Sequence, residues 1–391
     1  MTDRRALIIG GGIGGVAAAL SLAQHGFKVE VFERAAQFAE IGAGIQLGPN
    51  SIRALSMLDV GERAARLTVH PEALVMMDAL DARAVVRIET GPTFERRFGA
   101  PYGLIHRADL HSALLETARA NPDITLRAGE TISEFADHGD HVSVQTAAGS
   151  VVGDLLVGAD GLWSKTREFV VGDGPPRRSG HIAYRAVLPT AEVPPHLRRP
   201  EMVLWAGPKC HLVHYPLRGG ELFNLVAVFH SERYQEGWDS AGDPQELQLR
   251  FAQTHSDVRT MLGKISQWRM WVLCDREPIA NWSRGRVTLL GDAAHPMLQY
   301  LAQGAGMAME DAVCLGQTLS DPSTPISEAL AEYPKRRYLR TGRAQLTARL
   351  YGEFFHATGV RRELRNSFLA SGLNIEGLAW LYDPVGTGQA A

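Results

Sequence analysis

The sequence is poor in cysteine, has no long apolar run, and carries almost no excess of either charge. Its 391 residues include three cysteines, Cys210, Cys274 and Cys314. An odd number with no short paired spacing argues against a disulfide framework and against a zinc site, so we expect no metal and a reducing compartment. No run reaches the roughly 18 apolar residues of a membrane-spanning helix, so we expect no integral membrane segment and a cytoplasmic protein.

The charge balance gives no sign of a nucleic-acid partner. The chain has 40 basic and 43 acidic residues, a formal net charge of -3, and it lacks the positive excess of proteins that bind phosphate backbones. Its adjacent arginines are scattered, and we expect them on the solvated surface: Arg177-Arg178, Arg198-Arg199 and Arg336-Arg337. The length of 391 residues and the hydrophobic share of 45% predict a globular protein with two domains or one large domain.

A glycine-rich turn between a strand and a helix lies near the start of the chain. Residues 5–9 (RALII) predict a short apolar strand, followed by the dinucleotide-binding spacing GxGxxG and a small-residue helix. A second strand, KVEVFE, ends at Glu33, 18 residues beyond Gly15, where a carboxylate can bind both hydroxyls of an adenosine ribose. We therefore predict a dinucleotide site with these contacts: Gly10, Gly12, Ile13, Gly15, Glu33 and Arg34.

A second glycine-and-aspartate strand end lies in DLLVGADGLWSKTR, residues 154–167. An apolar strand runs into Asp160, and Ser164 and Arg167 follow at a predicted helix start. This pattern is consistent with a nucleotide contact at Asp160. It is equally consistent with an ordinary Asp-Gly turn in which Ser164 caps the helix.

The third such strand end lies in VTLLGDAAHPMLQYLAQGAGMAMEDAVC, residues 287–314. A buried strand leads to Asp292, an irregular loop follows, and a helix opens at Gly304-Ala305-Gly306. A helix start built of small residues lets a ligand approach the backbone closely, and Asp292 can accept hydrogen bonds from ligand hydroxyls. Three similar strand ends, near residues 10, 160 and 292, predict one nucleotide site built from distant parts of the chain.

Short segments rich in β-branched and aromatic residues lie between the second and third motifs: 180–190, 201–206, 210–217, 221–230 and 268–274. They predict a mostly antiparallel sheet, with a hairpin turn through Gly219-Gly220. Residues 241–263 have a helical pattern, and so do residues 325–352. The latter segment is polar and rich in arginine, so we expect an exposed helix.

Together, the three motifs and the segment GAGMAMEDA resemble the single-component FAD-dependent aromatic hydroxylases, the group A flavoprotein monooxygenases, over nearly the whole chain. The resemblance implies bound FAD, NADH or NADPH as co-substrate, and a homodimer. It associates Asp160 with both cofactors and Asp292 with the FAD ribityl chain. Arg107, in IHRADLHSAL, matches the family arginine that contacts FAD, although the residues alone equally favour a surface arginine at a helix start.

The resemblance and the order of segments predict an α/β fold. We expect a Rossmann-like FAD-binding domain of the GR2 type, as in 4-hydroxybenzoate hydroxylase, with an inserted, mostly antiparallel β-sheet substrate domain and C-terminal helices. The predicted boundaries are 1–75, 101–175 and 276–320 for the FAD-binding domain, 76–100 and 176–275 for the substrate domain, and 321–391 for the helical segment.

The strand CHLVHYPL, residues 210–217, carries candidate catalytic residues. Strand alternation places His211, Val213 and Tyr215 on one face. Leu212 and His214 lie on the other. His211 and Tyr215 are roughly 13 Å apart along an ideal strand, so their side chains would converge on a small ring from both ends. By themselves, a histidine and a tyrosine on a strand are ordinary sheet residues.

Within the family, three features resemble the hydroxylases of 3-hydroxybenzoate: the loop Ile41–Asn50, the His211 and Tyr215 pair, and Gln299. Hydroxylases of salicylate and 6-hydroxynicotinate commonly have a histidine near the Gln299 position. The implied reaction uses NADH and O2 to form a flavin hydroperoxide, which converts 3-hydroxybenzoate to 2,5-dihydroxybenzoate. Hydroxylation of salicylate or 6-hydroxynicotinate, and an FAD-dependent reductase without oxygen insertion, remain alternatives.

This chemistry assigns a role to each candidate residue. A phenol titrates near pKa 10, so holding it ionised near neutral pH takes on the order of 4 kcal/mol of differential stabilisation. His211 is the side chain expected to accept the proton. Gln299 would orient the phenolic oxygen, and Tyr215 would complete the proton relay or stabilise the intermediate. The sequence shows no obvious arginine to bind the carboxylate.

Overall fold

The computed structural model describes residues 4–39, 43–231, 240–372 and 375–383. Part of the predicted loop Ile41–Asn50 and the end of the predicted helical segment 321–391 lie outside these residues. None of the helices in the described ranges is both long enough and apolar enough to cross a membrane.

One sheet has six strands in the order β18-β19-β11-β1-β2-β7, and all neighbours in it are parallel except β18 and β19. The strands are β1 Arg4–Ile9, β2 Phe27–Glu33, β7 Ile124–Ala128, β11 Leu155–Gly158, β18 Ser283–Arg284 and β19 Val287–Leu289. Because β1, β2, β11 and β19 run parallel, the three glycine-and-aspartate segments and Glu33 follow at one edge of this sheet.

Both faces of the six-stranded sheet are covered, which explains why β1 is apolar at successive positions. Ala6 and Ile8 pack in one core with the helices of that face, while Leu7 packs in another core with the small sheet opposite. The helices are α1 Ile13–Gln24, α2 Pro49–Met57, α3 Gly61–Ala65, α5 Arg107–Ala120 and α9 Gly304–Thr318. The opposite side has α6 Lys165–Val170 and strands β8 Phe135–Asp137, β9 Val142–Thr146 and β10 Gly149–Gly153.

A second sheet has eight strands in the order β16-β17-β12-β15-β14-β13-β4-β5. Only β13 and β4 pair in parallel, so the mostly antiparallel sheet is confirmed. The strands are β4 Ala73–Asp78, β5 Ala84–Glu89, β12 Arg177–Pro189, β13 Met202–Gly207, β14 Cys210–Leu217, β15 Leu222–His230, β16 Ser240–Ala241 and β17 Arg269–Asp275. The predicted hairpin joins β14 to β15 through Gly219 and Gly220, whose φ angles are +65° and +91°.

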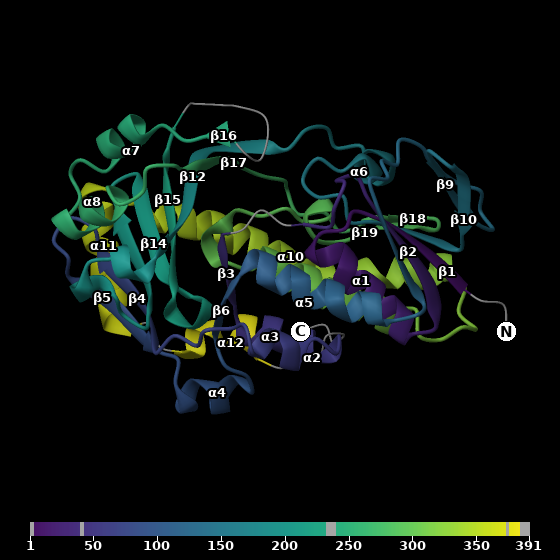
Figure 1. The fold of residues 1–391 in the computed structure, drawn as a ribbon, viewed down its shortest axis with the longest axis horizontal. Helices are drawn as coiled ribbons and strands as arrows, with labels where there is room; N and C mark the ends of the chain where they lie inside the picture. Colours follow the sequence, from purple (N-terminus) through teal and green to yellow (C-terminus); the bar gives the residue numbers. More distant parts are fainter. Residues whose placement is uncertain (1–3, 40–42, 232–239, 373–374, 384–391) are drawn as a thin grey trace.

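The eight-stranded sheet also has two buried faces. One packs against α7 Pro244–Arg250 and α8 Ser256–Leu262, two short helices where the sequence predicted helical structure over 241–263. The other packs against elements from the rest of the chain, including α10 Ile326–Phe355 and α12 Ala379–Tyr382. In Figure 1, β4, β5, β14 and β15 lie toward the left and β9 and β10 toward the right, with α1, α5 and α10 between them.

The prediction that residues 325–352 form an exposed helix is wrong in one respect. Residues 326–355 are the helix α10, but a whole face of it is buried, including Tyr333 and Arg337. Arg337, expected on the solvated surface, is 2% exposed because Glu310 and Asp311 of α9 accept hydrogen bonds from it. A buried arginine looks like a surface arginine in sequence until its partner carboxylates are known.

The remaining elements connect these layers. The two-stranded sheet of β3 Gly44–Leu47 and β6 Gly103–His106 links the two halves. The remaining α-helices are α4 Pro92–Phe98 and α11 Gly359–Gly372. Short 3-10 helices lie at η1 Thr190–Glu192, η2 Pro195–Leu197, η3 Arg218–Gly220, η4 Gly291–Ala293, η5 Gln299–Leu301 and η6 Ile375–Leu378. Strand β4 begins before the boundary predicted at residues 75 and 76, so one strand spans that boundary.

Candidate active site

The turn from β1 to α1 depends on two of the predicted glycines. Gly10 has a φ of +107°, and a Cβ there would run into the carbonyl oxygen of Ala159 on the neighbouring segment. A Cβ at Gly15 would run into the carbonyl oxygen of Gly10. Only glycine allows this backbone and this close packing of strand and helix. Gly12 is the N-cap of α1, and Ile13 is its buried first residue.

Two helices that pack against each other both begin without a cap. Neither α1 nor α9 has a side-chain hydrogen bond at its N-cap or an acidic residue in its first turn. Their first N–H groups and the positive ends of their dipoles suit a diphosphate. Asp292 lies beside the start of α9, since a Cβ on Gly304 would be 3.8 Å from its Oδ1. These features fit FAD.

The small residues at the start of α9 do not all face the same way. A Cβ on Gly306 would collide with the Ser51 hydroxyl of α2, and it would lie 3.5 Å from Asn50 Nδ2. Gly306 therefore allows α9 to pack closely on α2, while Gly304 and Ala305 open the helix beside Asp292. A direct cofactor contact by Gly306, Ala305 or Gly304 stays a prediction.

Glu33 is fixed at the end of β2. Gly11 N–H donates to Oε2 at 2.8 Å and Ala35 N–H donates to Oε1 at 2.8 Å, so the carboxylate is tied to the glycine turn. A carboxylate oxygen can accept more than one hydrogen bond, which leaves room for ribose hydroxyls. Arg34, the next residue, is exposed.

The Asp160 carboxylate accepts hydrogen bonds from residues of its own segment. Ser164 Oγ donates to Oδ1 at 2.5 Å, and Thr166 donates to Oδ2 through both N–H and hydroxyl at 3.1 Å. Ser164 in turn accepts from Arg167 N–H at 2.8 Å, so it does cap α6. Arg167 donates to the carbonyl oxygens of residues 293 and 294 at 2.9 and 2.6 Å. The middle motif thus supports the loop after Asp292, and a direct cofactor contact by Asp160 stays a prediction.

The candidate catalytic strand β14 alternates as predicted. Val213 and Tyr215 pack in the core shared with α10 and α12, whereas Leu212 packs in the core under α7 and α8. His214, on the face of Leu212, accepts a hydrogen bond from Trp205 Nε1 at 3.1 Å. His211 and Tyr215 therefore share the face that looks toward the FAD-binding elements.

At one end of this face, Tyr215 and Asn224 meet β3. Gly44 N–H donates to Asn224 Oδ1 at 2.7 Å, and a Cβ on Gly44 would be 2.8 Å from the Tyr215 hydroxyl. Burial raises the pKa of Tyr215 against an opposing effect of Arg185, so the hydroxyl stays protonated at neutral pH. Asn224 Nδ2 is buried and, within the described part of the chain, has no hydrogen-bond partner.

Arg185 of β12 lies in the middle of the same face, and sequence reasoning missed it. Its Nη2 donates to Gln299 Oε1, and its guanidinium lies 5.4 Å from the ring centroid of Trp271. Its Nε is buried without a partner, and none of the described carboxylates forms an ion pair with it. Burial lowers its pKa to about 10, and the positive charge of Arg107 adds to that effect. A clue was available, because alternation along GHIAYRAV turns this arginine inward.

Gln299, on η5, is half-buried and faces the protein interior. Because Arg185 donates to its oxygen, its NH2 group remains a donor for another ligand. Arg107, at the start of α5, is close enough to influence the charge of Arg185. Gln299 therefore joins the loop that follows Asp292 to the sheet through Arg185, and its contact with substrate stays a prediction.

His211 lies at the other end of the face. It is 3% exposed, its ring lies 5.4 Å from that of Tyr300, and its Nδ1 forms a 2.8 Å hydrogen bond with His356 Nε2. Burial, together with the nearby His181, lowers the pKa of His211 to about 3. The histidine is therefore neutral at neutral pH, the form that can accept a proton, and its role as the acceptor of the phenolic proton stays a prediction.

Comparisons with known proteins agree with this geometry. Residues 3–345 match the FAD binding domain family. The chain is 46% identical over 382 residues to a 3-hydroxybenzoate 6-hydroxylase of Klebsiella oxytoca, covering 97% of this chain and 96% of the relative. A salicylate hydroxylase substrate complex is 26% identical with a TM-score of 0.83, covering 98% of this chain and 96% of that one.

A second solved structure is Klebsiella pneumoniae HpxO complexed with FAD and uric acid. It is 26% identical, has a TM-score of 0.85, and the match covers 98% of each chain. The family model covers most of the chain and the Klebsiella oxytoca relative covers nearly all of it, and the uncapped helices, Glu33 and Asp292 fit a bound flavin nucleotide. The chain belongs to the FAD-dependent aromatic hydroxylases and is a flavoprotein monooxygenase.

Proposed function

We propose that this enzyme uses NADH and O2 to hydroxylate 3-hydroxybenzoate para to its hydroxyl group, giving 2,5-dihydroxybenzoate. Support comes from the Klebsiella oxytoca relative and from glutamine, not histidine, at position 299. Bound FAD would take the hydride and supply the electrophilic oxygen. The side chains of the sheet face would bind the ring, orient it and remove its phenolic proton.

The observation that carries this proposal is the unbalanced charge of Arg185. A guanidinium enclosed on its Nε side, with no carboxylate beside it, is stabilised by a ligand that brings a negative charge. An aromatic carboxylate provides that charge together with a flat ring that fits among apolar side chains such as Val213 and Val226. We assign Arg185 to the substrate carboxylate, with Asn224 Nδ2 as a second donor.

The phenolic end of the substrate would then meet Gln299 and His211. The amide NH2 of Gln299 donates to the phenolic oxygen, while the unengaged Nε2 of His211 accepts its proton. Tyr215 remains protonated and so contributes a hydrogen-bond donor rather than a base. An ionised phenol directs attack to the ring carbon para to its oxygen.

The proposal is tested with a panel of hydroxylated acids. NADH oxidation, oxygen uptake and product are measured with 3-hydroxybenzoate, salicylate, 4-hydroxybenzoate and 6-hydroxynicotinate. We expect 3-hydroxybenzoate to give 2,5-dihydroxybenzoate in amounts that match the NADH consumed. Coupled turnover of salicylate or 6-hydroxynicotinate instead would assign the enzyme to that substrate. NADH oxidation without any hydroxylated product would favour a reductase.

We also propose a homodimer. The outer faces of two C-terminal helices carry exposed apolar residues at helical spacing: Leu339, Leu346 and Leu350 of α10, and Val360, Leu364 and Phe368 of α11. Such stripes are typical of surfaces covered by another protein, and a second copy of the chain is the proposed occupant. Light scattering should give twice the mass of one chain, and Leu364→Glu should give monomers. Because the proposed co-substrate is NADH, we place the enzyme in the cytoplasm.

A further inference from the structure

Three histidines form an unbroken chain of hydrogen bonds that begins at the candidate active site. His211 Nδ1 lies 2.8 Å from His356 Nε2, and His356 Nδ1 lies 3.0 Å from His230 Nε2. The three residues come from β14, the end of α10 and the end of β15, so the chain of bonds exists only in the folded protein. Both ring nitrogens of His356 are used.

The two buried histidines of this hydrogen-bonded series, His211 and His356, do not hold an extra proton for long. His211 and His356 are 3% and 5% exposed. Burial lowers the pKa of His356 well below its usual value, and the neighbouring His211, His181 and His230 lower it further. A lasting imidazolium would therefore be unfavourable at either position. A neutral imidazole can still accept a proton at one nitrogen while it releases another from the opposite nitrogen.

His230, the outer end of this hydrogen-bonded series, reaches the surface. His230 is only half-buried, and its charged neighbours are Lys209, Glu353 and Arg250, from the turn before β14, from α10 and from α7. Burial and the charge of Lys209 lower the pKa of His230, so it too returns a proton to water readily at neutral pH. The chain thus runs from a buried end beside the substrate face to an end in contact with solvent.

We propose that His211, His356 and His230 form a proton relay that carries the phenolic proton of the substrate to solvent. The inference rests on the proposed function, because it needs a phenolic substrate beside His211. The phenol O–H bond breaks as His211 Nε2 gains the proton, and the Nδ1 proton of His211 passes to His356 Nε2. The Nδ1 proton of His356 then passes to His230 Nε2, and His230 releases its Nδ1 proton to water. One proton leaves the substrate, one enters solvent, and no histidine stays charged.

His181 provides a matched control. It lies in the same cluster, with its ring 4.2 Å from that of His230 and 5.0 Å from that of His356. Its hydrogen bond goes elsewhere, because its Nδ1 lies 2.5 Å from the Tyr300 hydroxyl. It is buried like His211 and His356, yet it is outside the sequence of bonds that leads to solvent.

The same cluster offers a competing interpretation. Nitrogen atoms of His181, His230 and His356 lie within 4.8 Å of one another, close enough to rearrange around a metal ion. A His356 nitrogen bound to a metal could not also keep its hydrogen bond, and both nitrogens are hydrogen-bonded here, so the observed bonds favour the relay. Metal analysis of the purified protein separates the two interpretations.

The experiment uses FAD-loaded enzyme without oxygen or NADH, mixed rapidly with 3-hydroxybenzoate in weak buffer that contains a pH indicator. The change in flavin absorbance reports substrate binding, and the indicator reports proton release. We expect wild-type enzyme and His181→Gln to release one proton quickly. His356→Phe should bind substrate but release the proton on the order of 100-fold more slowly. His230→Ala should also be slow, and added imidazole should restore its rate.

The possible failures are distinguishable. If 3-hydroxybenzoate leaves the flavin spectrum of the wild type unchanged, the substrate proposal fails. If His356→Phe binds substrate and releases its proton at the wild-type rate, the relay is overturned. It is also overturned if slow release in His230→Ala does not respond to imidazole, or if purified enzyme holds one zinc ion that is lost in His181→Gln. Equal FAD content and equal melting temperatures confirm that each variant is folded.

Discussion

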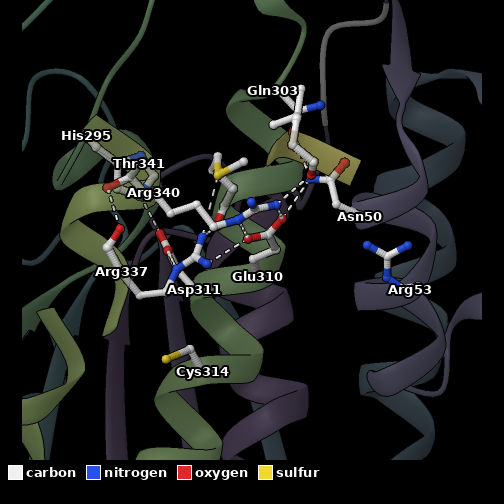
Figure 2. A network of polar contacts seen from close by, with 12 residues as sticks. Asn50, Arg53, His295, Gln303, Glu310, Asp311, Cys314, Arg337, Arg340 and Thr341 are labelled. Carbon is white, nitrogen blue, oxygen red and sulfur yellow. Dashed lines mark hydrogen bonds and ion pairs between the residues drawn. The ribbon is translucent and has the colours of Figure 1, made fainter. Parts of the chain in front are cut away.

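Two arginines that face the interior from opposite halves of the molecule have different surroundings. On the cofactor side, Arg337 donates to Glu310 and Asp311 of α9 at 2.7 Å each. Figure 2 shows the network of contacts around these two carboxylates. On the substrate side, Arg185 has no carboxylate partner among the described residues. The chain balances the charge that fixes a helix and leaves unbalanced the charge that we propose meets a ligand.

The pKa values of these groups follow the same division. Burial would lower the pKa of Arg337, but Glu310 and Asp311 overcome this effect and raise it. Burial would also raise the pKa of Glu310, yet Arg337 and Arg340 hold it at about 2. Arg185 has no such partner, and burial lowers its pKa to about 10. The cofactor-side network therefore stays charged near neutral pH. The charged form of Arg185, by contrast, would be stabilised by a bound anion.

The largest effect is expected from Arg337→Met. Removing this guanidinium leaves Glu310 and Asp311 buried with less compensation, which should lower the free energy of unfolding by about 3–5 kcal/mol. Because α9 begins beside Asp292, FAD should also dissociate more readily. Urea unfolding and FAD release measure both effects. Arg336→Met is the matched control, since Arg336 is exposed, and an equal loss in both variants would contradict the role of the network.

Arg185→Met should leave stability nearly unchanged and weaken the substrate. We expect the KM for 3-hydroxybenzoate to rise about 100-fold, equivalent to about 3 kcal/mol, because a carboxylate loses its charged partner. Arg185→Lys should recover part of the loss. Steady-state kinetics with the uncharged analogue 3-hydroxybenzamide provide the control. A variant that still prefers the acid over the amide as strongly as wild type would show that another residue binds the carboxylate.

These two arginines also show where sequence reasoning ends. The GxGxxG turn, the hairpin at Gly219 and the alternation on β14 follow from local spacing, and the fold confirms them. The carboxylate partners of Arg337 lie on another helix. Whether Arg185 has a carboxylate partner depends on every side chain packed around it in the fold. Nothing in the spacing of residues distinguishes a balanced arginine from an unbalanced one.

The two halves should also respond to different pH ranges. A histidine in the unfolded chain titrates near pH 6.5, whereas burial lowers the pKa of His211 to about 3 and that of His181 to about 4. The unfolded state therefore binds more protons below pH 6.5, and stability that is present above pH 6.5 is lost as pH falls. We expect a loss of about 2 kcal/mol per histidine between pH 6.5 and 5.

Glu310 loses its contribution at lower pH than the histidines, because a glutamate in the unfolded chain titrates near pH 4.5 rather than 6.5. Its contribution is present above pH 4.5 and is lost as pH falls toward 2. Unfolding free energies measured from pH 8 to pH 2 test this order. His211→Phe should flatten the curve from pH 6.5 down to about pH 3, where His211 itself titrates in the folded enzyme. A curve of unchanged slope in that variant would mean that the histidine cluster is not neutral in the folded enzyme.

A smaller effect is expected from Gln299→Leu. The change removes one neutral hydrogen bond to the phenolic oxygen and one acceptor for Arg185, so kcat/KM should fall about tenfold, or about 1.4 kcal/mol. FAD affinity should stay at the wild-type value. Steady-state kinetics and flavin titration measure the two quantities, and an unaltered kcat/KM would place Gln299 outside the substrate site.

The histidine chain marks a second limit of prediction. Strand alternation was enough to place His211 on the correct face, and the resemblance gave it a proton to accept. Its low pKa and its bond to His356, 145 residues away in the chain, depend on burial and on where α10 ends. The residue was found from sequence, but the way it could move a proton was not.

The most direct test of the account compares His211→Ala with His214→Ala, two changes on opposite faces of the same strand. The measured quantity is the fraction of oxidised NADH recovered as 2,5-dihydroxybenzoate, with the remainder measured as hydrogen peroxide. We predict that His211→Ala keeps its FAD, hydroxylates on the order of 100-fold more slowly and releases peroxide, while His214→Ala stays coupled. Fully coupled turnover by His211→Ala would remove this histidine from the mechanism and contradict the account.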